Sequence, residues 1–139
     1  MLVIKPRRTR PLLTPPPSES PFKGTTGWRR IWNALGYSLA GFSIAYRHES
    51  AFRQEVGLSL VLIPVSFFFP ATGSGHALMI SSILLVLLVE LLNSAVEAAV
   101  DRISLEHHRL SKRAKDIGSA AVLISLVNVL VVWVAVLFF

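Results

Sequence analysis

Apolar residues recur at steps of three and four early in the chain and then form three longer runs. In the early stretch, from Trp28 to Arg47, the apolar positions form one narrow stripe of a helix and the arginines point elsewhere. The stripe consists of Trp28, Ile31, Trp32, Leu35, Leu39, Phe42 and Tyr46. This pattern is typical of an amphipathic helix that lies in a membrane interface with its tryptophans at headgroup depth. A soluble core helix has the same period, but the rest of the chain offers no soluble core.

The three longer runs predict membrane-spanning helices. The first covers residues 56–69 and approaches the roughly 20 residues of a bilayer crossing when it is extended back to Ala51. Pro64 lies inside this run and should kink or locally open the helix, because proline has no backbone donor. The uncharged segment 71–75 predicts a short turn.

The second run starts near His76 and extends to about Leu105, which is longer than one crossing, so its last turns should project into the cytoplasm. The third covers about residues 114–139 and carries no charge after Asp116. We therefore predict an all-α membrane protein with one interfacial helix and three transmembrane helices.

Composition and charge support a membrane setting. The 139 residues are 53% hydrophobic and contain no cysteine, which excludes disulfides, thiolate metal sites and a cysteine nucleophile. Mean hydropathy is +0.58, high for a soluble domain. Residues 1–27 are rich in proline and arginine and should form a disordered cytoplasmic tail, which leaves residues 28–139 as one membrane domain.

The distribution of arginine and lysine predicts the topology. The net charge of +6 could suggest nucleic acid as a partner, but the basic residues flank the apolar runs, at the depth of lipid headgroups. They precede the first span and separate the second from the third: Arg29, Arg30, Arg47, Arg53, Arg102, Arg109, Lys112, Arg113 and Lys115. By the positive-inside bias, the N-terminus and the 102–115 loop are cytoplasmic and the C-terminus is outside.

Four polar residues interrupt the second span on one face. At about 100° per residue, Glu90, Asn93, Glu97 and Asp101 fall within roughly one 80° sector of the helix. A carboxylate in hydrocarbon costs on the order of 3 kcal/mol, so two glutamates on one stripe need a compensating reason. They could reach toward the interface or pair with basic residues. Because Asn93 and Asp101 continue the stripe, we favour an active site.

A second polar segment opens the third run. Read as a helix, it places Lys112, Lys115, Asp116 and Ser119 on one face. Lys112 serves equally well as a topology anchor. Lys115 stands beside a carboxylate and is followed by the small residues 118–121, which let helix backbones approach closely. We therefore expect Lys115 to face the carboxylate stripe of the second span.

Carboxylates, an amide and a lysine at the cytoplasmic face of a membrane suit phosphoryl transfer from a nucleotide. That chemistry needs carboxylates to hold a divalent cation, a cation on the phosphates and a base for the acceptor hydroxyl. The chain has neither GxxxxGK[ST] nor GxGxxG, so a P-loop and a protein-kinase site are excluded.

Several motifs carry a family resemblance. The strings ELLNSAVEAAVDRI at 90–103 and RAKDIGSAAV at 113–122, with GYS at 36–38 and ESAFRQE at 49–55, resemble the prokaryotic diacylglycerol kinase family. The resemblance extends over roughly residues 28–133. It implies a homotrimeric lipid kinase of the bacterial inner membrane that phosphorylates diacylglycerol with MgATP to give phosphatidic acid, at active sites shared between subunits.

The resemblance also implies residue roles. Glu90 matches the general base on the lipid hydroxyl, Asn93 an amide that supports the site, and Glu49 and Glu97 the ligands of Mg²⁺. The implied nucleotide contacts are Arg30, Tyr37, Glu49, Glu97, Glu106, His108, Lys115 and Asp116. The implied lipid contacts are Arg30, Ala34, Ser38, Ala51, Arg53, Glu55, Glu90 and Ser119.

Two features depart from the family: the tail at 1–27 is extra, and the loop 104–109 matches only loosely around one histidine.

Two other functions remain open. One is the same chemistry on a polyprenol, as in undecaprenol kinases, although the 49–55 segment resembles the diacylglycerol branch more. The other is a small proton-coupled transporter, which would explain Glu90 but not Lys115 and the rest of the stripe.

Overall fold

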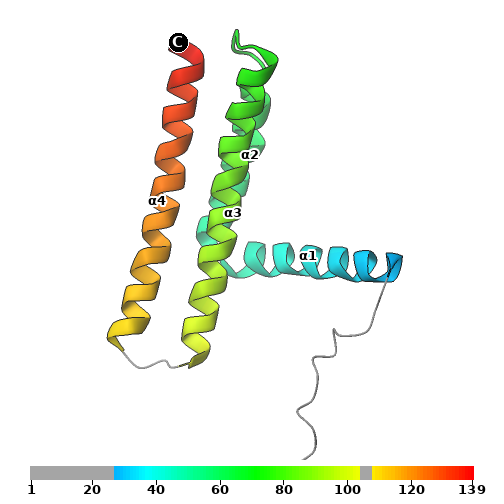
Figure 1. The fold of residues 1–139 in the computed structure, drawn as a ribbon, viewed down its shortest axis with the longest axis vertical. Helices are drawn as coiled ribbons and strands as arrows, with labels where there is room; N and C mark the ends of the chain where they lie inside the picture. The colour runs from blue at the N-terminus through cyan, green and yellow to red at the C-terminus, as the bar shows by residue number, and fades with distance from the viewer. Residues whose placement is uncertain (1–26, 104–107) are drawn as a thin grey trace, which may run out of the picture. The chain divides into compact units, whose positions relative to one another are not determined.

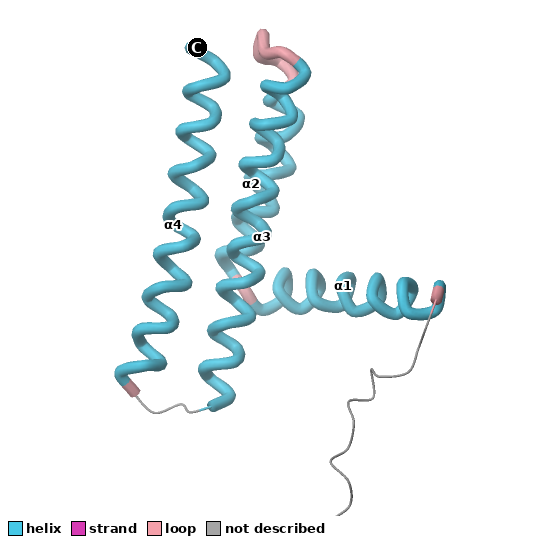
Figure 2. Tube along the Cα trace, viewed as in Figure 1, coloured by secondary structure: helices cyan, strands magenta, loops and turns pink. Residues whose placement is uncertain are grey.

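The described part of the chain, residues 27–103 and 108–139 of the computed structural model, consists of four helices and contains no strand (Figures 1 and 2). They are α1 (Trp28–His48), α2 (Ser50–Ser66), α3 (Gly73–Ile103) and α4 (Arg109–Phe138). The all-α class is confirmed for these residues. The predicted disorder of residues 1–26 and the predicted contact of Glu106 lie outside the described residues.

The chain divides into two compact units, residues 1–37 and residues 38–139. In the first unit, Gly27 adopts a positive φ of 74°, which glycine tolerates without strain, and its carbonyl accepts a hydrogen bond from the Arg30 amide at 3.0 Å. The helix that starts there exposes its tryptophans, with Trp28 79% and Trp32 69% accessible. Such exposure suits a helix whose apolar stripe contacts lipid.

The second unit contains the last turns of α1 and all of α2, α3 and α4. In it α3 packs against both α2 and α4, and Figure 1 shows the three running side by side. The buried apolar residues are few: Ala45, Phe52, Met79, Ile83 and Val86. Most large apolar side chains of the three helices are exposed, which is what a surface facing hydrocarbon requires.

Two helices of the described part, rather than the three expected, are long and apolar enough to cross a membrane: α3 and α4. Helix α2 has 17 residues and is about 26 Å long, short of the roughly 30 Å of a hydrocarbon core. It runs through Pro64 and ends at Ser66, where the Phe67 amide bonds to the Pro64 carbonyl at 3.2 Å. Pro64 therefore lies in the last turn, where the helix ends.

Helices α3 and α4 both begin earlier than the hydrophobic pattern predicts, because polar side chains cap them. The Thr72 hydroxyl accepts a hydrogen bond from the Gly75 amide at 3.1 Å, so residues 73–75 are helical and their predicted assignment to a turn is wrong. The His108 ring accepts one from the Leu110 amide at 3.2 Å, which starts α4 at Arg109 instead of near residue 114.

Candidate active site

The polar stripe of α3 continues the buried face of the same helix. Met79 is 0%, Ile83 4% and Val86 5% accessible, and Glu90 follows at 4%. These residues and Glu97 fall within about one 60° sector of the helix, since each is spaced by three, four or seven from the next. The structure thus places a carboxylate in the core, between apolar residues and the charged end of the helices.

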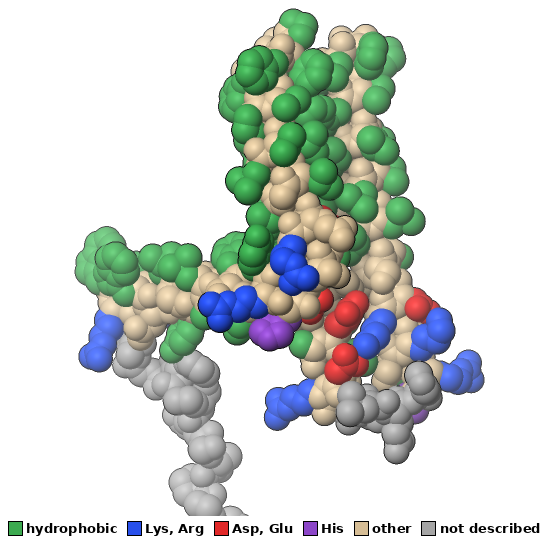
Figure 3. Space-filling model, turned by 180° about the vertical axis from the view of Figure 1, so that it is seen from behind, with side chains coloured by type: hydrophobic (Ala, Val, Ile, Leu, Met, Phe, Trp, Pro, Cys, Tyr) green, Lys and Arg blue, Asp and Glu red, His purple; other side chains and the backbone are tan. Residues whose placement is uncertain are grey.

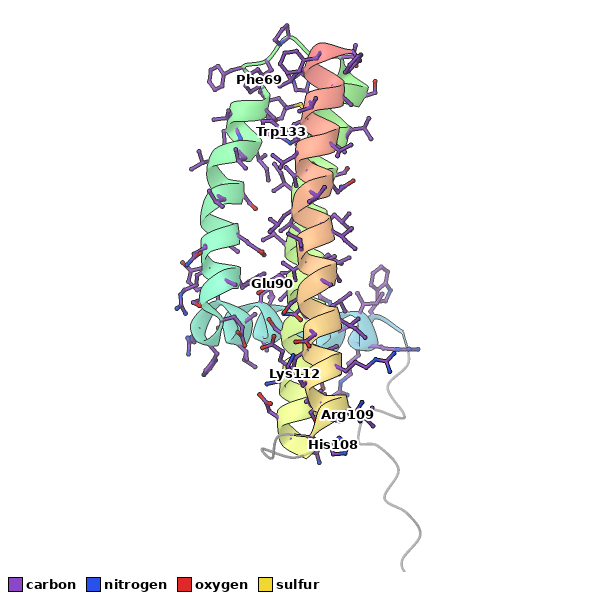
Figure 4. All side chains as sticks on the ribbon, turned by 90° about the vertical axis from the view of Figure 1, so that its left-hand side faces the viewer. Phe69, Glu90, His108, Arg109, Lys112 and Trp133 are labelled. Carbon is purple, nitrogen blue, oxygen red and sulfur yellow. The ribbon has the colours of Figure 1, made fainter. Side chains whose placement is uncertain are left out.

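Charged side chains gather at one end of the second unit. Figure 4 shows Phe69 and Trp133 at one end of the helices, in edge-on contact with ring centroids 6.0 Å apart. It shows His108, Arg109 and Lys112 at the other end, and Glu90 between the two. In Figure 3, acidic and basic side chains gather where α3 ends and α4 begins, while apolar side chains cover the opposite part of these helices. The stripe therefore opens toward the charged end.

Three further carboxylates lie close enough to Glu90 for their charges to act on it. Glu97 comes from the same helix, Glu49 from the junction of α1 and α2, and Glu55 from the second turn of α2. All three are half-buried. Like charges at such close range raise each other's energy, and a bound cation lowers it. The periodicity of the sequence had not revealed Glu49, which the family resemblance alone indicated.

The junction that carries Glu49 is held by an arginine. Glu49 has an extended backbone, with φ −102° and ψ 114°, between two helices. The Arg53 guanidinium donates to the carbonyl of Tyr46 at 3.2 Å and to that of Arg47 at 3.0 Å. Both carbonyls belong to the last turn of α1, where backbone carbonyls have no donor within the helix, and a cation placed there donates the missing hydrogen bonds. Arg53 therefore fixes the corner from which Glu49 projects.

A cavity of about 420 Å³ lies beside this corner, between the last turns of α1 and the face of α3 next to the stripe. Ser38 and Glu49, two of the predicted site residues, line it together with Ser94. Glu55 borders a different cavity, of about 270 Å³, whose other lining residues are Ser59 and apolar side chains of α2, α3 and α4.

An amide on α3 is hydrogen-bonded to the next carboxylate of the stripe. The Asn93 side-chain nitrogen donates to Glu97 Oε1 at 3.2 Å, one helical turn away. Asn93 faces α4, where a Cβ added to Gly118 would overlap its side-chain oxygen. Asn93 is therefore in direct contact with Glu97, and its support of a catalytic site stays a prediction.

The predicted approach of Lys115 to the stripe is confirmed. Its ammonium lies 2.7 Å from Asp101 Oδ1, which joins the start of α4 to the end of α3. Asp116, the neighbour of Lys115 in sequence, instead pairs with Lys112 at 2.6 Å, one turn back on an exposed surface. The side chains of neighbouring helical residues point about 100° apart, so Lys115 and Asp116 each pair with another residue although they are adjacent in sequence. Asp101 belongs to none of the predicted contact sets, and the structure shows it as the partner of Lys115.

The remaining predicted residues are distributed as follows. Arg30, Ala34 and Tyr37 lie in the first unit, on exposed turns of α1. Ala51 and Ser119 are exposed on α2 and α4. His108 caps α4 through its ring, which is a structural role that the sequence had not indicated.

No group of three or more histidine, aspartate or glutamate side chains in the described residues is arranged to hold a metal ion. Glu49 and Glu97 are nevertheless oxygen donors of the kind that Mg²⁺ prefers, and Mg²⁺ usually takes one or two carboxylates and fills its other positions with water and substrate phosphates. The donor set fits Mg²⁺ bound together with a nucleotide.

Comparisons with known proteins point to one family. Residues 36–137 match the family described as "Prokaryotic diacylglycerol kinase". The chain is 59% identical over 120 residues to a protein of Pseudomonas aeruginosa named "Diacylglycerol kinase". The aligned residues make up 86% of this chain and 98% of that protein. Proteins with the same name from Haemophilus influenzae and Escherichia coli are 53% and 48% identical, over 83% and 78% of this chain and 98% and 89% of their own lengths.

Proposed function

Because this chain belongs to the prokaryotic diacylglycerol kinase family and is a kinase, we propose that it phosphorylates diacylglycerol with ATP, yielding phosphatidic acid and ADP, at the cytoplasmic face of the bacterial inner membrane. The observation that carries the proposal is Glu90, a carboxylate buried at the membrane end of the stripe, with Glu97 close enough to act on it and the Lys115–Asp101 pair further along the stripe, at its charged end. This arrangement supplies both a base and a charged site for phosphates.

Glu90 is the base in this scheme. Its carboxylate takes the proton of the lipid hydroxyl as that oxygen attacks the γ-phosphorus of ATP, while the bond from phosphorus to the β,γ-bridging oxygen breaks and ADP leaves. Glu90 is buried at the end of the apolar face, where little water reaches it. A base in this position would reach the hydroxyl of a lipid whose acyl chains stay in the membrane. Asn93 keeps the neighbouring carboxylate oriented through its bond to Glu97.

Glu49 and Glu97 would hold Mg²⁺, which when bound would screen the phosphate charges. The action of the Glu49 and Glu97 charges on Glu90 supports this role, because a cation would relieve that repulsion. Lys115, held at the stripe by Asp101, would contact the phosphates. Arg30, Tyr37, Glu106, His108 and Asp116 complete the proposed nucleotide contacts.

The lipid side of the proposed site is formed by α1, α2 and α4. Glu55 borders an apolar cavity, and Ser38 lies with Glu49 in the cavity beside the corner, which supports a substrate with a polar head and apolar chains. Arg30, Ala34, Ala51, Arg53 and Ser119 are further proposed lipid contacts. The amphipathic α1 would lie in the interface.

We propose α2 as a third span beside α3 and α4, with the N-terminus cytoplasmic and the C-terminus periplasmic, on the basis of the positive-inside bias. A crossing by the short α2 would need local thinning of the bilayer or help from flanking residues. We also propose a homotrimer with active sites shared between subunits. The many exposed apolar side chains and the small residues of α4 support close packing against further helices.

The test is a kinase assay with purified protein, radiolabelled ATP and Mg²⁺, offering diacylglycerol and undecaprenol in matched detergent micelles, with Glu90→Gln as the blank. Label in phosphatidic acid, absent from the Glu90→Gln sample, is the expected result. Label confined to undecaprenyl phosphate would show that the substrate is undecaprenol and not diacylglycerol. Label in neither lipid would overturn the proposal.

A further inference from the structure

A glycine of α4 meets a predicted site residue of α3. A Cβ built on Gly118 would overlap Oδ1 of Asn93 and lie 3.3 Å from its Cγ. No real side chain tolerates such an overlap. At Gly36, Gly41 and Gly57 an added Cβ meets no atom within 4 Å, and at Gly75, the other crowded glycine of the described residues, the nearest atom is 2.9 Å away and belongs to Val136, outside the polar stripe.

The orientation of the Asn93 amide follows from its two neighbours. Only the NH₂ end can donate to a carboxylate, and it donates to Glu97 Oε1 at 3.2 Å. The oxygen end must then point the other way, toward the backbone of Gly118. There Oδ1 is buried, without a hydrogen-bond partner among the described residues. A buried acceptor left unpaired is unfavourable, so it persists only where other contacts fix the group.

We propose that Gly118 is a positioning residue of the kinase: the space left by its missing side chain sets the Asn93 amide so that its NH₂ end orients the Glu97 carboxylate. The inference rests on the proposed function in that it takes Glu97 as a ligand of the MgATP complex. Helix α4 thus contributes to catalysis through its backbone as well as through Lys115.

Alanine at position 118 separates this role from a general packing role. The atom that a new methyl group meets is the far end of a flexible side chain, so rotation of Asn93 relieves the contact without parting the helices. Alanine is also a better helix former than glycine, which favours retention of α4. Gly118→Ala should therefore insert and assemble while its Asn93 amide turns away from Glu97.

The first experiment is a double-mutant cycle on kcat with Gly118→Ala, Asn93→Ala and the two combined. We expect Gly118→Ala to lower kcat by about 10- to 100-fold, the order that a misplacement of about 1 Å costs. Because the methyl group acts through Asn93, adding it to Asn93→Ala should change kcat by less than about twofold. Gly57→Ala, at a glycine of α2 with open space, is the matched control and should keep wild-type kcat.

The second experiment does not depend on activity. The asparagines of the chain are Asn33, Asn93 and Asn128, so ¹⁵N-asparagine labelling isolates the Asn93 side-chain amide in an NMR spectrum. Gly118→Ala should shift this signal in the same direction as Glu97→Gln does, since both remove its bond to the carboxylate. The signals of Asn33 and Asn128 should stay in place.

Wild-type kcat in Gly118→Ala, full additivity with Asn93→Ala, or an unshifted Asn93 signal would each overturn the positioning role. If Gly118→Ala and the double variant both fail to insert, glycine serves helix packing alone and the proposal is wrong. If the wild-type protein phosphorylates no lipid, the proposed function fails, while the NMR experiment still decides whether Gly118 orients Asn93.

Discussion

One face of α3 serves two purposes along its length. In the half next to the α2–α3 connection it presents Met79, Ile83 and Val86, which are buried and make the core against the neighbouring helices. From Glu90 onward the same face presents carboxylates and an amide. Glu90, where the two halves meet, is as inaccessible to solvent as Ile83. The same helical geometry that buries apolar residues also buries a base, and only residue type separates core from site.

The comparison predicts its largest effect at Glu90. Glu90→Gln keeps the size of the side chain and removes the base, so kcat should fall by about 10²–10⁴-fold, the usual loss for a general base. Binding of MgATP and insertion into the membrane should remain. The measurement is steady-state kinetics beside nucleotide binding by equilibrium dialysis.

The matched control is Met79→Ala, three turns back on the same face and outside both cavities. It removes buried apolar contacts and should lower the unfolding temperature while kcat stays near wild type. A Met79→Ala loss of kcat as large as that of Glu90→Gln would erase the distinction between the two halves of the face. Near-normal turnover in Glu90→Gln would remove Glu90 from the mechanism.

A smaller effect is expected at Glu97, where the loss can be offset from outside. Glu97→Gln deletes one proposed ligand charge, so turnover should need more Mg²⁺ and should recover in part as Mg²⁺ is raised. A Mg²⁺ titration of activity in wild type and variant measures this. Wild-type activity that persists undiminished in EDTA would contradict the metal role.

The third prediction asks whether one chain completes the site. Glu49 lies close enough to act on Glu90 within a single chain, yet the proposed trimer shares sites between subunits. If sites are shared, co-expressed Glu49→Gln and Glu97→Gln chains should regain activity, because some sites then combine two intact halves. Mixed oligomers isolated with two different tags supply the sample. If they stay as inactive as either variant alone, each chain provides its own Glu49 and Glu97.

The smallest effect is expected at the ion pairs of the charged end. Asp101→Asn removes the partner of Lys115 and should raise KM for ATP by about fivefold or less at unchanged kcat, because so exposed a pair contributes little. Lys112→Ala breaks the exposed pair with Asp116 and should change KM by less than about twofold. Activity measured against ATP at low and high salt separates the two. Equal effects would show that Asp101 has no special relation to the site.

Helix content and the stripe could be predicted from the sequence, because both depend on local periodicity. The spacing of Glu90, Asn93 and Glu97 already placed them on one face, and the small residues after Lys115 indicated a close approach of helices. Local reasoning failed at the ends of elements. The apolar pattern starts the third run near residue 114, whereas the His108 cap starts α4 at Arg109, and it carries the first run to residue 69, whereas α2 ends at Ser66.

The sequence alone specifies an all-α membrane chain with carboxylates on one helical face and, through its motifs, the kinase family. Which groups meet depends on the tertiary structure: Lys115 pairs with Asp101 instead of Asp116, Asn93 lies against Gly118, and Glu49 acts on Glu90 from a corner held by Arg53. Periodicity fixes the direction of a side chain around its own helix axis. It leaves open the shift and rotation of one helix against the next, and those set every contact between helices.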